Sequence, residues 1–287
     1  MVDALRSFLF VPANQPKRIP KALASGADAV ILDLEDTVPP PEKPAARNEV
    51  RAALGLPRTC KLYVRVNPAS TPFCYDDLIG SLGKGLDGVM LPKVDRPGEA
   101  EAVDWVLTQL ERQHGISPNA IDLLPIIESA LGVVHLEAIA RSTPRIRRLT
   151  FGAGDLGRDL GMTQTMDDVA TADVRARIVL HSRALEREPP IDTVHFDVRD
   201  LEGLGVAARR ARAFGFQGKL CIHPDQVAVV NAAFTPSPEE VARAEKIIAA
   251  FVEAEAKGIA SITVDGAFVD YPIVAQARRT LALAKRG

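Results

Sequence analysis

The chain has 287 residues, of which 47% are hydrophobic and 25% charged, the proportions of an ordinary globular protein with a large core. Its 35 lysines and arginines nearly balance its 37 aspartates and glutamates, for a net charge of −2. Bulk charge therefore gives no reason to expect a nucleic acid or an anionic membrane as partner. The three cysteines, Cys60, Cys74 and Cys221, form no CxxC pair, which excludes the usual patterns of a disulfide framework or a zinc knuckle.

The amino terminus and the apolar runs predict neither export nor membrane insertion. Residues 1–6 lack a basic segment followed by a long apolar one, so we expect no signal peptide. No apolar run reaches the roughly 18 residues that a membrane span needs. We therefore predict a cytoplasmic protein with reduced cysteines.

Eight short segments rich in apolar and β-branched residues recur along the chain, each followed by polar residues. We predict strands at 7–11, 29–34, 62–66, 88–91, 123–127, 148–151, 194–196 and 219–222. Segments with helical spacing lie between them, such as 99–112 and 170–185. This alternation is typical of a parallel sheet covered on both faces, and eight units favour a closed α/β barrel, the (β/α)8 TIM barrel, over an open doubly wound sheet. No GxGxxG or Walker-type loop is present, which removes the main cues for a nucleotide site.

The last 57 residues lie outside the eightfold repeat. The run SPEE at 237–240 predicts a helix start, because it combines an N-cap, a proline at the first helical position and a capping box. A hairpin over 260–269 with its turn at Asp265-Gly266, and a final helix from near Pro272, are expected to follow. We therefore predict a barrel over residues 1–230 and a C-terminal segment over 231–287. That segment is either a lid or oligomerisation arm, or a pair of helices that only pack.

Polar residues at the carboxyl ends of the strands are the candidates for chemistry, because barrel active sites lie there. In strand order from the second to the eighth they are Asp33, Glu35 and Asp36; Arg65 and Asn67; Lys93; Glu128; Asp155; His195 and Asp197; and His223. Gathering so many ionisable groups at one rim costs repulsion and desolvation, which is typical of a functional site.

Carboxylates dominate this rim, and clustered carboxylates repel one another unless a cation lies among them. Oxygen ligands without cysteine or a histidine pair favour a hard ion such as Mg²⁺. Glu128 and Asp155 come from adjacent strand ends and match the one or two carboxylates that Mg²⁺ usually takes. Either one alone is equally explained as a helix cap or a salt-bridge partner.

Arg65 is the natural anion clamp, because a guanidinium meets a carboxylate in a bidentate fork. The alternative is that it only neutralises the carboxylates after the second strand, and Lys93 could pair with the same acids. His195 and His223 are more simply explained by hydrogen bonds to nearby backbone.

Nine short stretches in chain order carry a resemblance to a known family. They are RSFLFVP (6–12), LDLEDTV (32–38), KPAAR (43–47), VRVN (64–67), LPKV (91–94), IESA (127–130), FGAGDL (151–156), CIHP (221–224) and GAFVDYP (266–272). Each is weak alone, but nine in order are specific. The sequence resembles the CitE-like branch of the HpcH/HpaI aldolase and citrate lyase superfamily, which includes the citrate lyase β subunit, malyl-CoA lyases and citramalyl-CoA lyases.

The resemblance implies a barrel with a C-terminal lid, assembled as a trimer or hexamer, that binds Mg²⁺. It implies that Glu128 and Asp155 hold the metal next to the substrate and that Arg65 contacts the substrate. It also implies that Asp270, in the lid, reaches the active site of a neighbouring subunit as a catalytic residue. The residues expected around this site are Glu35, Asp36 and Lys93.

The expected activity is that of a Mg²⁺-dependent carbon–carbon lyase that cleaves a citryl-, malyl- or citramalyl-CoA type of thioester to a 2-oxo acid and acetyl-CoA. Three alternatives stay open: a malyl- or citramalyl-CoA thioesterase, an aldolase acting on free 2-keto acids, and a citrate lyase subunit whose substrate hangs on an acyl-carrier protein. Gly154 stands where the family often has a polar residue, and Ala13 where glycine is common, which leaves the acyl group open.

Overall fold

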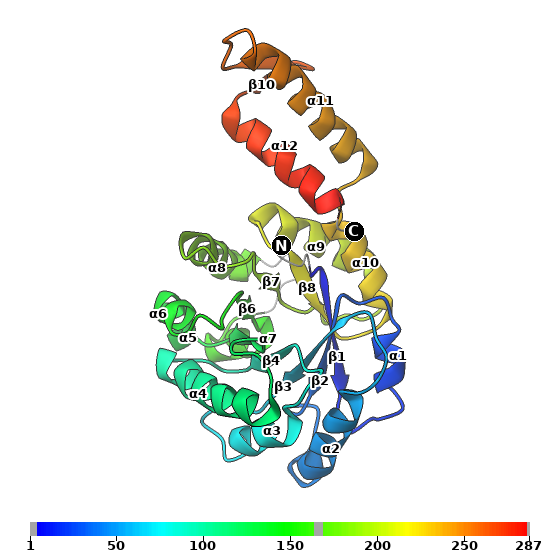
Figure 1. Ribbon diagram of the computed structural model, residues 1–287, viewed down its shortest axis with the longest axis vertical. Coiled ribbons are helices and arrows are strands. Elements are labelled where there is room, and N and C mark those ends of the chain that lie inside the picture. Colours follow the sequence, from blue (N-terminus) through cyan, green and yellow to red (C-terminus); the bar gives the residue numbers. More distant parts are fainter. Residues whose placement is uncertain (1–4, 164–168, 286–287) are drawn as a thin grey trace. The chain divides into compact units, whose positions relative to one another are not determined.

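Eight parallel strands close into a barrel in the order in which they occur in the chain (Figure 1). The computed structural model describes residues 5–163 and 169–285. The strands are β1 (Ser7–Pro12), β2 (Ala29–Asp33), β3 (Lys61–Arg65), β4 (Gly88–Leu91), β5 (Asp122–Ile127), β6 (Thr150–Phe151), β7 (Ile191–Asp192) and β8 (Gly218–Cys221). Because β1 also pairs with β8, with Ser7 opposite Lys219, the sheet has no open edge. The predicted TIM barrel is confirmed and the open sheet is excluded.

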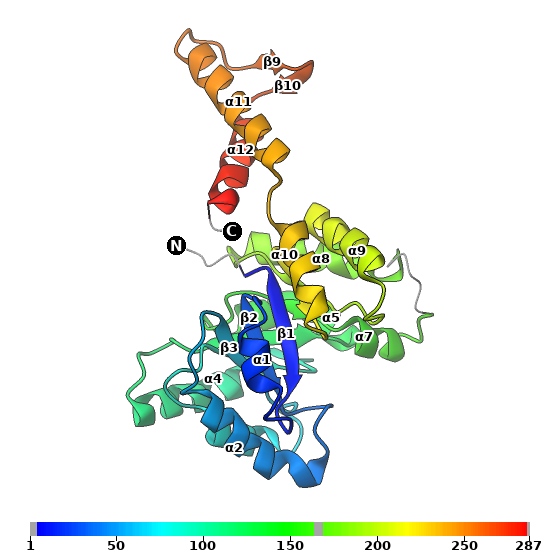
Figure 2. The ribbon, with the colours of Figure 1, turned by 90° about the vertical axis from the view of Figure 1, so that its right-hand side faces the viewer.

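Helices surround the strands, as both ribbon views show (Figure 2). They are α1 (Ile19–Leu23), α2 (Lys43–Ala53), α3 (Cys74–Ser81), α4 (Pro97–His114), α5 (Ala130–Val134), α6 (Leu136–Arg141), α7 (Ala153–Asp159), α8 (Ala172–Ala184), α9 (Leu201–Phe214) and α10 (Asp225–Phe234). Two short 3-10 turns, η1 (Pro40–Glu42) and η2 (Val169–Thr171), lie before α2 and α8. Within the described residues, no helix is long and apolar enough to cross a membrane.

The strands are buried along almost their whole length, since helices cover the outside and side chains fill the inside. Every residue of β2, β4 and β5 is buried. One cluster joins side chains from most strands: Leu5, Phe8, Ala29, Ile31, Tyr63, Met90, Leu124, Ile126, Ile191 and Leu220. The interior is therefore packed, and only the loops at the strand ends are free to build a site.

The seventh strand is not where the apolar pattern placed it. We predicted 194–196, but β7 is Ile191–Asp192, and Phe196 lies in the following loop with 53% of its surface exposed. The pattern was misleading because β7 carries a fully buried charge. Asp192 pairs with Arg175 at 2.9 Å and with Lys219 at 2.5 Å, so the ion pairs compensate its burial.

The C-terminal elements match the expected helix, hairpin and helix. They are α11 (Pro238–Glu255), β9 (Ile262–Val264), β10 (Ala267–Val269) and α12 (Tyr271–Ala284). Both halves of the capping box at Ser237 and Glu240 are formed. Asp265 and Gly266 have φ of 50° and 78°, the left-handed pair that a two-residue hairpin turn requires.

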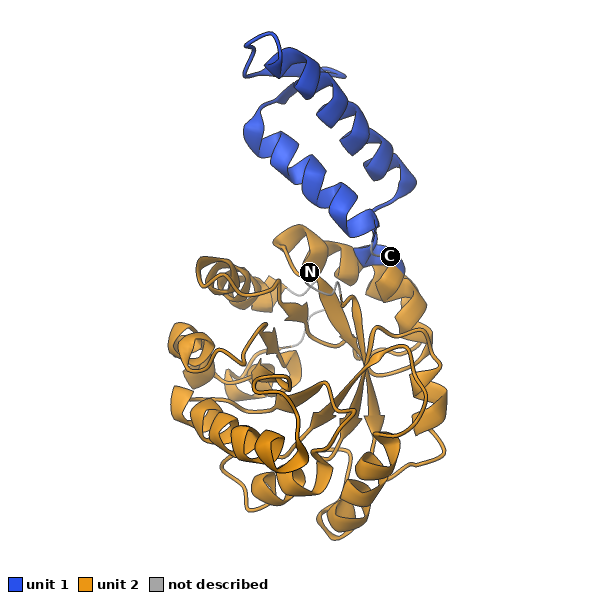
Figure 3. Cartoon of the chain, in the orientation of Figure 1, with its two compact units in different colours: residues 1–4, 232–287 blue, residues 5–231 orange. Residues whose placement is uncertain are grey.

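The chain divides into two compact units (Figure 3). The larger contains residues 5–231, and the smaller is built from residue 232 onward, so the division falls within α10. The smaller unit has a core of its own, made by Ala244, Ile247, Phe251, Val264, Val269, Val274 and Ala277. Whether it works as a lid stays a prediction.

Candidate active site

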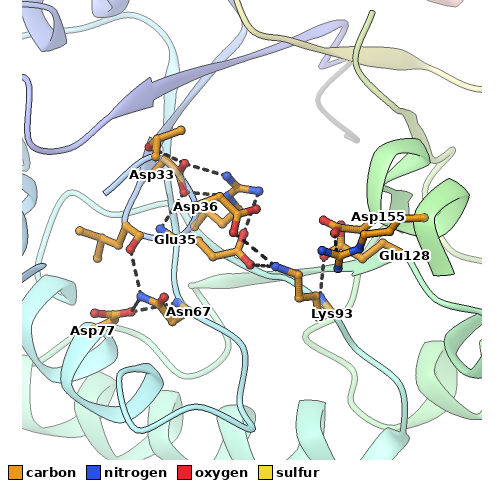
Figure 4. A network of polar contacts seen from close by, with 12 residues as sticks. Asp33, Glu35, Asp36, Asn67, Asp77, Lys93, Glu128 and Asp155 are labelled. Carbon is orange, nitrogen blue, oxygen red and sulfur yellow. Dashed lines mark hydrogen bonds and ion pairs between the residues drawn. The ribbon is translucent and has the colours of Figure 1, made fainter. Parts of the chain in front are cut away.

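Charged residues from four consecutive strand ends and from α7 lie together at the rim of the barrel. Figure 4 shows Asp33, Glu35 and Asp36 on one side, with Glu128 and Asp155 on the other. Lys93 lies between the two groups. The predicted convergence of the strand ends is therefore what the structure shows for these residues.

Arg65 binds two of the acids at the carboxyl end of β2. Its Nε and Nη2 each lie 2.7 Å from an oxygen of Asp33, and its Nη1 lies 2.9 Å from Glu35 Oε2. Its guanidinium also lies 4.8 Å from the centre of the Phe10 ring. Burial opposes ionisation of Asp33, but the attraction of Arg65, together with hydrogen bonds from Arg65, Thr37 and the main-chain N–H of Glu35, outweighs it and lowers the pKa of that carboxyl. In the structure Arg65 thus forms buried ion pairs with the acids after β2, which was the alternative to its role as an anion clamp for a ligand.

That engagement does not exhaust the hydrogen-bonding capacity of Arg65. A guanidinium carries five N–H groups. The hydrogen bonds to Asp33 use the N–H on Nε and one on Nη2, while the contact between Nη1 and Glu35 is an ion pair without a hydrogen bond. The other N–H on Nη2 and those on Nη1 are left over from these hydrogen bonds. Because both carboxylates hold the guanidinium in place, it can present these hydrogens in a fixed direction.

Two buried side chains, Lys43 and Asn67, hold the main chain at Leu34 and Glu35. Neither of them was given a role from the sequence. Lys43 donates from Nζ to the carbonyl oxygens of Leu34 at 2.6 Å and Glu35 at 2.9 Å. Asn67 donates from Nδ2 to the same Leu34 oxygen at 3.0 Å and to Asp77 at 2.6 Å. Lys43 lies in the KPAAR stretch and Asn67 in the VRVN stretch, and these motifs were the feature of the sequence that could have pointed to the two residues. Asp77 lies in no noted motif and could not have been found.

Glu128 is a buried and strongly perturbed carboxyl at the rim. Its residue is 5% exposed, and its Oε1 accepts a hydrogen bond of 2.7 Å from the main-chain N–H of Lys93. Burial, followed by repulsion from Glu35 and Asp155, raises the pKa of Glu128 to about 8. Gly152 lies directly against it, since a Cβ there would overlap Oε2.

Asp155 is the third residue of α7 and pairs with the exposed Arg158 at 2.8 Å, one turn along the same helix. It is close enough to Glu128 to raise the pKa of that carboxyl. Within the described residues, no three or more His, Cys, Asp or Glu side chains are arranged to hold a metal. Two carboxylates suit Mg²⁺, which keeps several waters, better than an ion that needs a full protein cage. A cation between them would also relieve the repulsion that Glu128 experiences.

The remaining candidates have local partners. His195 Nε2 lies 3.3 Å from Asp200, and His223 Nδ1 accepts from the N–H of Asp225 at 3.3 Å, which fits structural roles. Asp270 belongs to the C-terminal unit, where it is the N-cap of α12 and accepts from the N–H of Ile273 at 3.4 Å. Its predicted place at a barrel site stays a prediction.

A pocket of about 560 Å³ opens beside the charged rim. Its walls come from the segments that follow β2, β3 and β4, and they include Glu35, Asp36, Lys43, Phe73 and Lys93. The ammonium of Lys43 lies 5.4 Å from the centre of the Phe73 ring. The rim therefore has a hollow next to it that is large enough to receive part of a substantial ligand.

Comparison with known proteins identifies the group to which this barrel belongs. The model of the family "HpcH/HpaI aldolase/citrate lyase" matches residues 6–224. The chain belongs to the HpcH/HpaI aldolase/citrate lyase family. This assignment covers every strand of the barrel and all of the charged rim.

Members of the family resemble the chain over nearly its whole length. It is 37% identical to the L-malyl-CoA/beta-methylmalyl-CoA lyase of Cereibacter sphaeroides (strain ATCC 17025 / ATH 2.4.3), over 95% of this chain and 92% of that protein. It is 33% identical to citrate lyase subunit beta of Leuconostoc mesenteroides subsp. cremoris, over 97% and 93%. Among solved structures, the protein CitE from Mycobacterium tuberculosis in complex with magnesium, acetoacetate and coenzyme A superposes with a TM-score of 0.81, at 34% identity and 98% coverage of both chains.

Proposed function

We propose that this family member is a Mg²⁺-dependent carbon–carbon lyase that cleaves a malyl-, citramalyl- or citryl-CoA type of thioester to a 2-oxo acid and acetyl-CoA. The names of its relatives are those of lyases, and one similar structure contains both magnesium and coenzyme A. The observation that carries the proposal is the pair Glu128 and Asp155, two carboxylates held near enough to each other at the barrel rim for Asp155 to help raise the pKa of Glu128.

Glu128 and Asp155 are proposed to hold the metal. Bound Mg²⁺ supplies Lewis acidity, which lowers the pKa of a substrate hydroxyl at neutral pH. Glu128 fits this role because Lys93 occupies its Oε1, while Oε2 accepts no hydrogen bond from the described residues. Asp155 fits because the side chain of Arg158, with which it forms an ion pair, is 78% exposed and can turn away into solvent.

Arg65 is proposed to orient the substrate. Asp33 and Glu35 fix its guanidinium, and the N–H groups that they leave can bind the oxygens of the acyl group or of its carboxylate. An orienting group held rigidly before binding loses little further entropy when the substrate arrives. Lys93 and Asp36 complete the charge balance on the same side of the site, with Asp36 Oδ1 3.5 Å from Lys93 Nζ.

Asp270 is proposed as the proton donor. Loss of the hydroxyl proton and cleavage of the carbon–carbon bond leave the electron pair on the carbon next to the thioester carbonyl, and that carbon takes up a proton to become the methyl group of acetyl-CoA. We infer that Asp270 of a neighbouring subunit supplies it, so a homo-oligomer, trimeric or hexameric and cytoplasmic, is part of the proposal. Asp270 is the N-cap of α12, where its Oδ1 accepts from the N–H of Ile273, so the start of the helix fixes the position of its carboxyl group within the C-terminal unit.

The test is to incubate the purified chain with citryl-, malyl-, methylmalyl- and citramalyl-CoA, with Mg²⁺ or with EDTA, and to identify the products by mass. A 2-oxo acid together with a shorter acyl-CoA, formed only with Mg²⁺, is the expected result. A free hydroxy acid and CoA would instead establish a thioesterase. Turnover only after addition of an acyl-carrier protein would establish a citrate lyase subunit.

A further inference from the structure

Lys93 has a main-chain conformation that lysine rarely adopts. Its φ is 52°, in the left-handed region, two residues beyond the end of β4. Residues other than glycine and asparagine avoid the left-handed region, because there the Cβ atom approaches the following carbonyl oxygen. The other non-glycine residues with positive φ in the described chain are Asn119, Glu186 and Asp265, and none of them lies at the rim. Strain of this kind, at a group of charged residues, calls for a functional explanation.

The two ends of Lys93 contact different acids. Its main-chain N–H donates to Glu128 Oε1 at 2.7 Å, and its Nζ lies 2.5 Å from Glu35 Oε1 and 3.5 Å from Asp36 Oδ1. Figure 4 shows Lys93 spanning the space between Glu35 and Glu128. One residue therefore connects the acids after β2 with the proposed metal carboxylate after β5.

The left-handed conformation is what allows both contacts. The angle φ is the rotation about the N–Cα bond, so it determines how the side chain is turned relative to the N–H. At the negative φ of strands and helices the side chain and the N–H lie on the same side of that bond. At a φ of 52° the side chain is rotated away. Lys93 can then direct its N–H toward Glu128 and its ammonium toward Glu35.

We propose that Lys93 is a positioning residue for the metal: its left-handed main chain holds Glu128 Oε1 and so presents Oε2 as the ligand oxygen. This inference rests on the proposed Mg²⁺ site. It accounts for Gly152 as well, because the absence of a Cβ there leaves Oε2 uncovered. Glycine or asparagine would adopt the same conformation at lower cost, but neither carries the ammonium that Glu35 requires.

The experiment separates the main-chain role from the loss of charge. The variants Lys93→Gly, Lys93→Asn, Lys93→Ala and Lys93→Val all lack the ammonium, so any electrostatic effect is common to them. They differ in how readily they adopt a positive φ: glycine and asparagine do so easily, alanine less so, and valine least. The measurement is the Kd for Mg²⁺ alone, by calorimetry on the folded full-length chain without substrate.

The expected order of affinity is Gly and Asn first, Ala next and Val last, with Val about 5- to 30-fold weaker than Asn. If Lys93→Val does not fold, the comparison of Ala with Gly and Asn carries the test. Equal Kd values across the folded series would overturn the proposal.

Glu128→Gln distinguishes this failure from failure of the metal site. If Glu128→Gln loses Mg²⁺ binding while all folded Lys93 variants have the same Kd for Mg²⁺, the metal site is supported and only the role of Lys93 is wrong. If Glu128→Gln binds Mg²⁺ like the parent chain, the site itself is wrong, and the inference falls with it.

Discussion

Gly152→Ala is the change that tests the proposed metal site with the least disturbance. Gly152 precedes α7 with φ −107° and ψ 99°, which alanine adopts without strain. The nearest obstacle is Glu128. A Cβ at position 152 would lie 3.0 Å from Glu128 Cβ and 3.2 Å from its Cδ, and would overlap Oε2, whereas ordinary contacts are 3.4–4 Å. The three atoms nearest to the added methyl group all belong to Glu128, so the substitution acts first on that side chain.

The magnitude follows from the displacement that this overlap requires. Glu128 Cβ is fixed to the backbone after β5, so the carboxylate must rotate away by about 1 Å, and a misplacement of that size costs about 100-fold in rate. Overpacking of this kind also costs about 1–3 kcal/mol of stability. We expect kcat/KM to fall about 100-fold and the Kd for Mg²⁺ to rise, while the protein still folds.

The matched control is Gly157→Ala, in the middle of the same helix. Nothing lies within 4 Å of a Cβ at Gly157, and alanine is a better helix former than glycine by about 0.5–1 kcal/mol. This variant should therefore be as active as the parent and slightly more stable. The assays are thermal unfolding, Mg²⁺ calorimetry and turnover of the active thioester. A folded Gly152→Ala protein with unchanged Mg²⁺ affinity and turnover would refute the placement of Glu128 at the metal.

Two further predictions concern the proton donor and pH. Asp270→Asn should leave substrate KM nearly unchanged and cut kcat, because asparagine caps α12 as well as aspartate does while it cannot donate a carboxyl proton; a change in KM alone would argue for a packing role. In metal-free protein, Glu128 has a pKa raised to about 8, so the folded state holds its proton longer than the unfolded state. The stability contributed by that proton is complete below the ordinary pKa of glutamate and is lost as the pH rises through about 8. Mg²⁺ should therefore bind more tightly as the pH rises toward 8, and its binding should release protons, which calorimetry in buffers of different ionisation enthalpy measures. Glu128→Gln is the control and should show no such proton release. An affinity for Mg²⁺ that does not depend on pH in the parent chain would contradict the assignment.

The barrel could be predicted because its local patterns repeat. Near-continuous apolar strands such as β2 and β5 stand out from the helical segments between them, and eight of them suffice to indicate closure. The prediction was wrong at β7 because the strand is two residues long and one of them is Asp192. A charge buried by partners on β8 and α8 gives no local sign of being in a strand.

The residues of the candidate site could be predicted from their positions at strand ends, but their contacts could not. That Glu128 and Asp155 are near each other follows from the adjacency of β5 and β6 in a parallel barrel. That Arg65 binds both Asp33 and Glu35 depends on side-chain directions that no spacing reveals. The support from Asp77 through Asn67 is further removed, since α3 carries Asp77 to the site from outside any recognised motif.

The sequence by itself therefore determined the architecture, the family and the set of charged residues at one rim. These depend on periodicity, on strand order and on short motifs, all of which are local in the chain. Only the tertiary structure decided which oxygen of Glu128 is held, which side of Lys93 faces which acid, and why position 152 is glycine. Those features depend on one main-chain angle and on contacts of about 3 Å between segments distant in the chain, a scale at which hydrogen bonds form or fail.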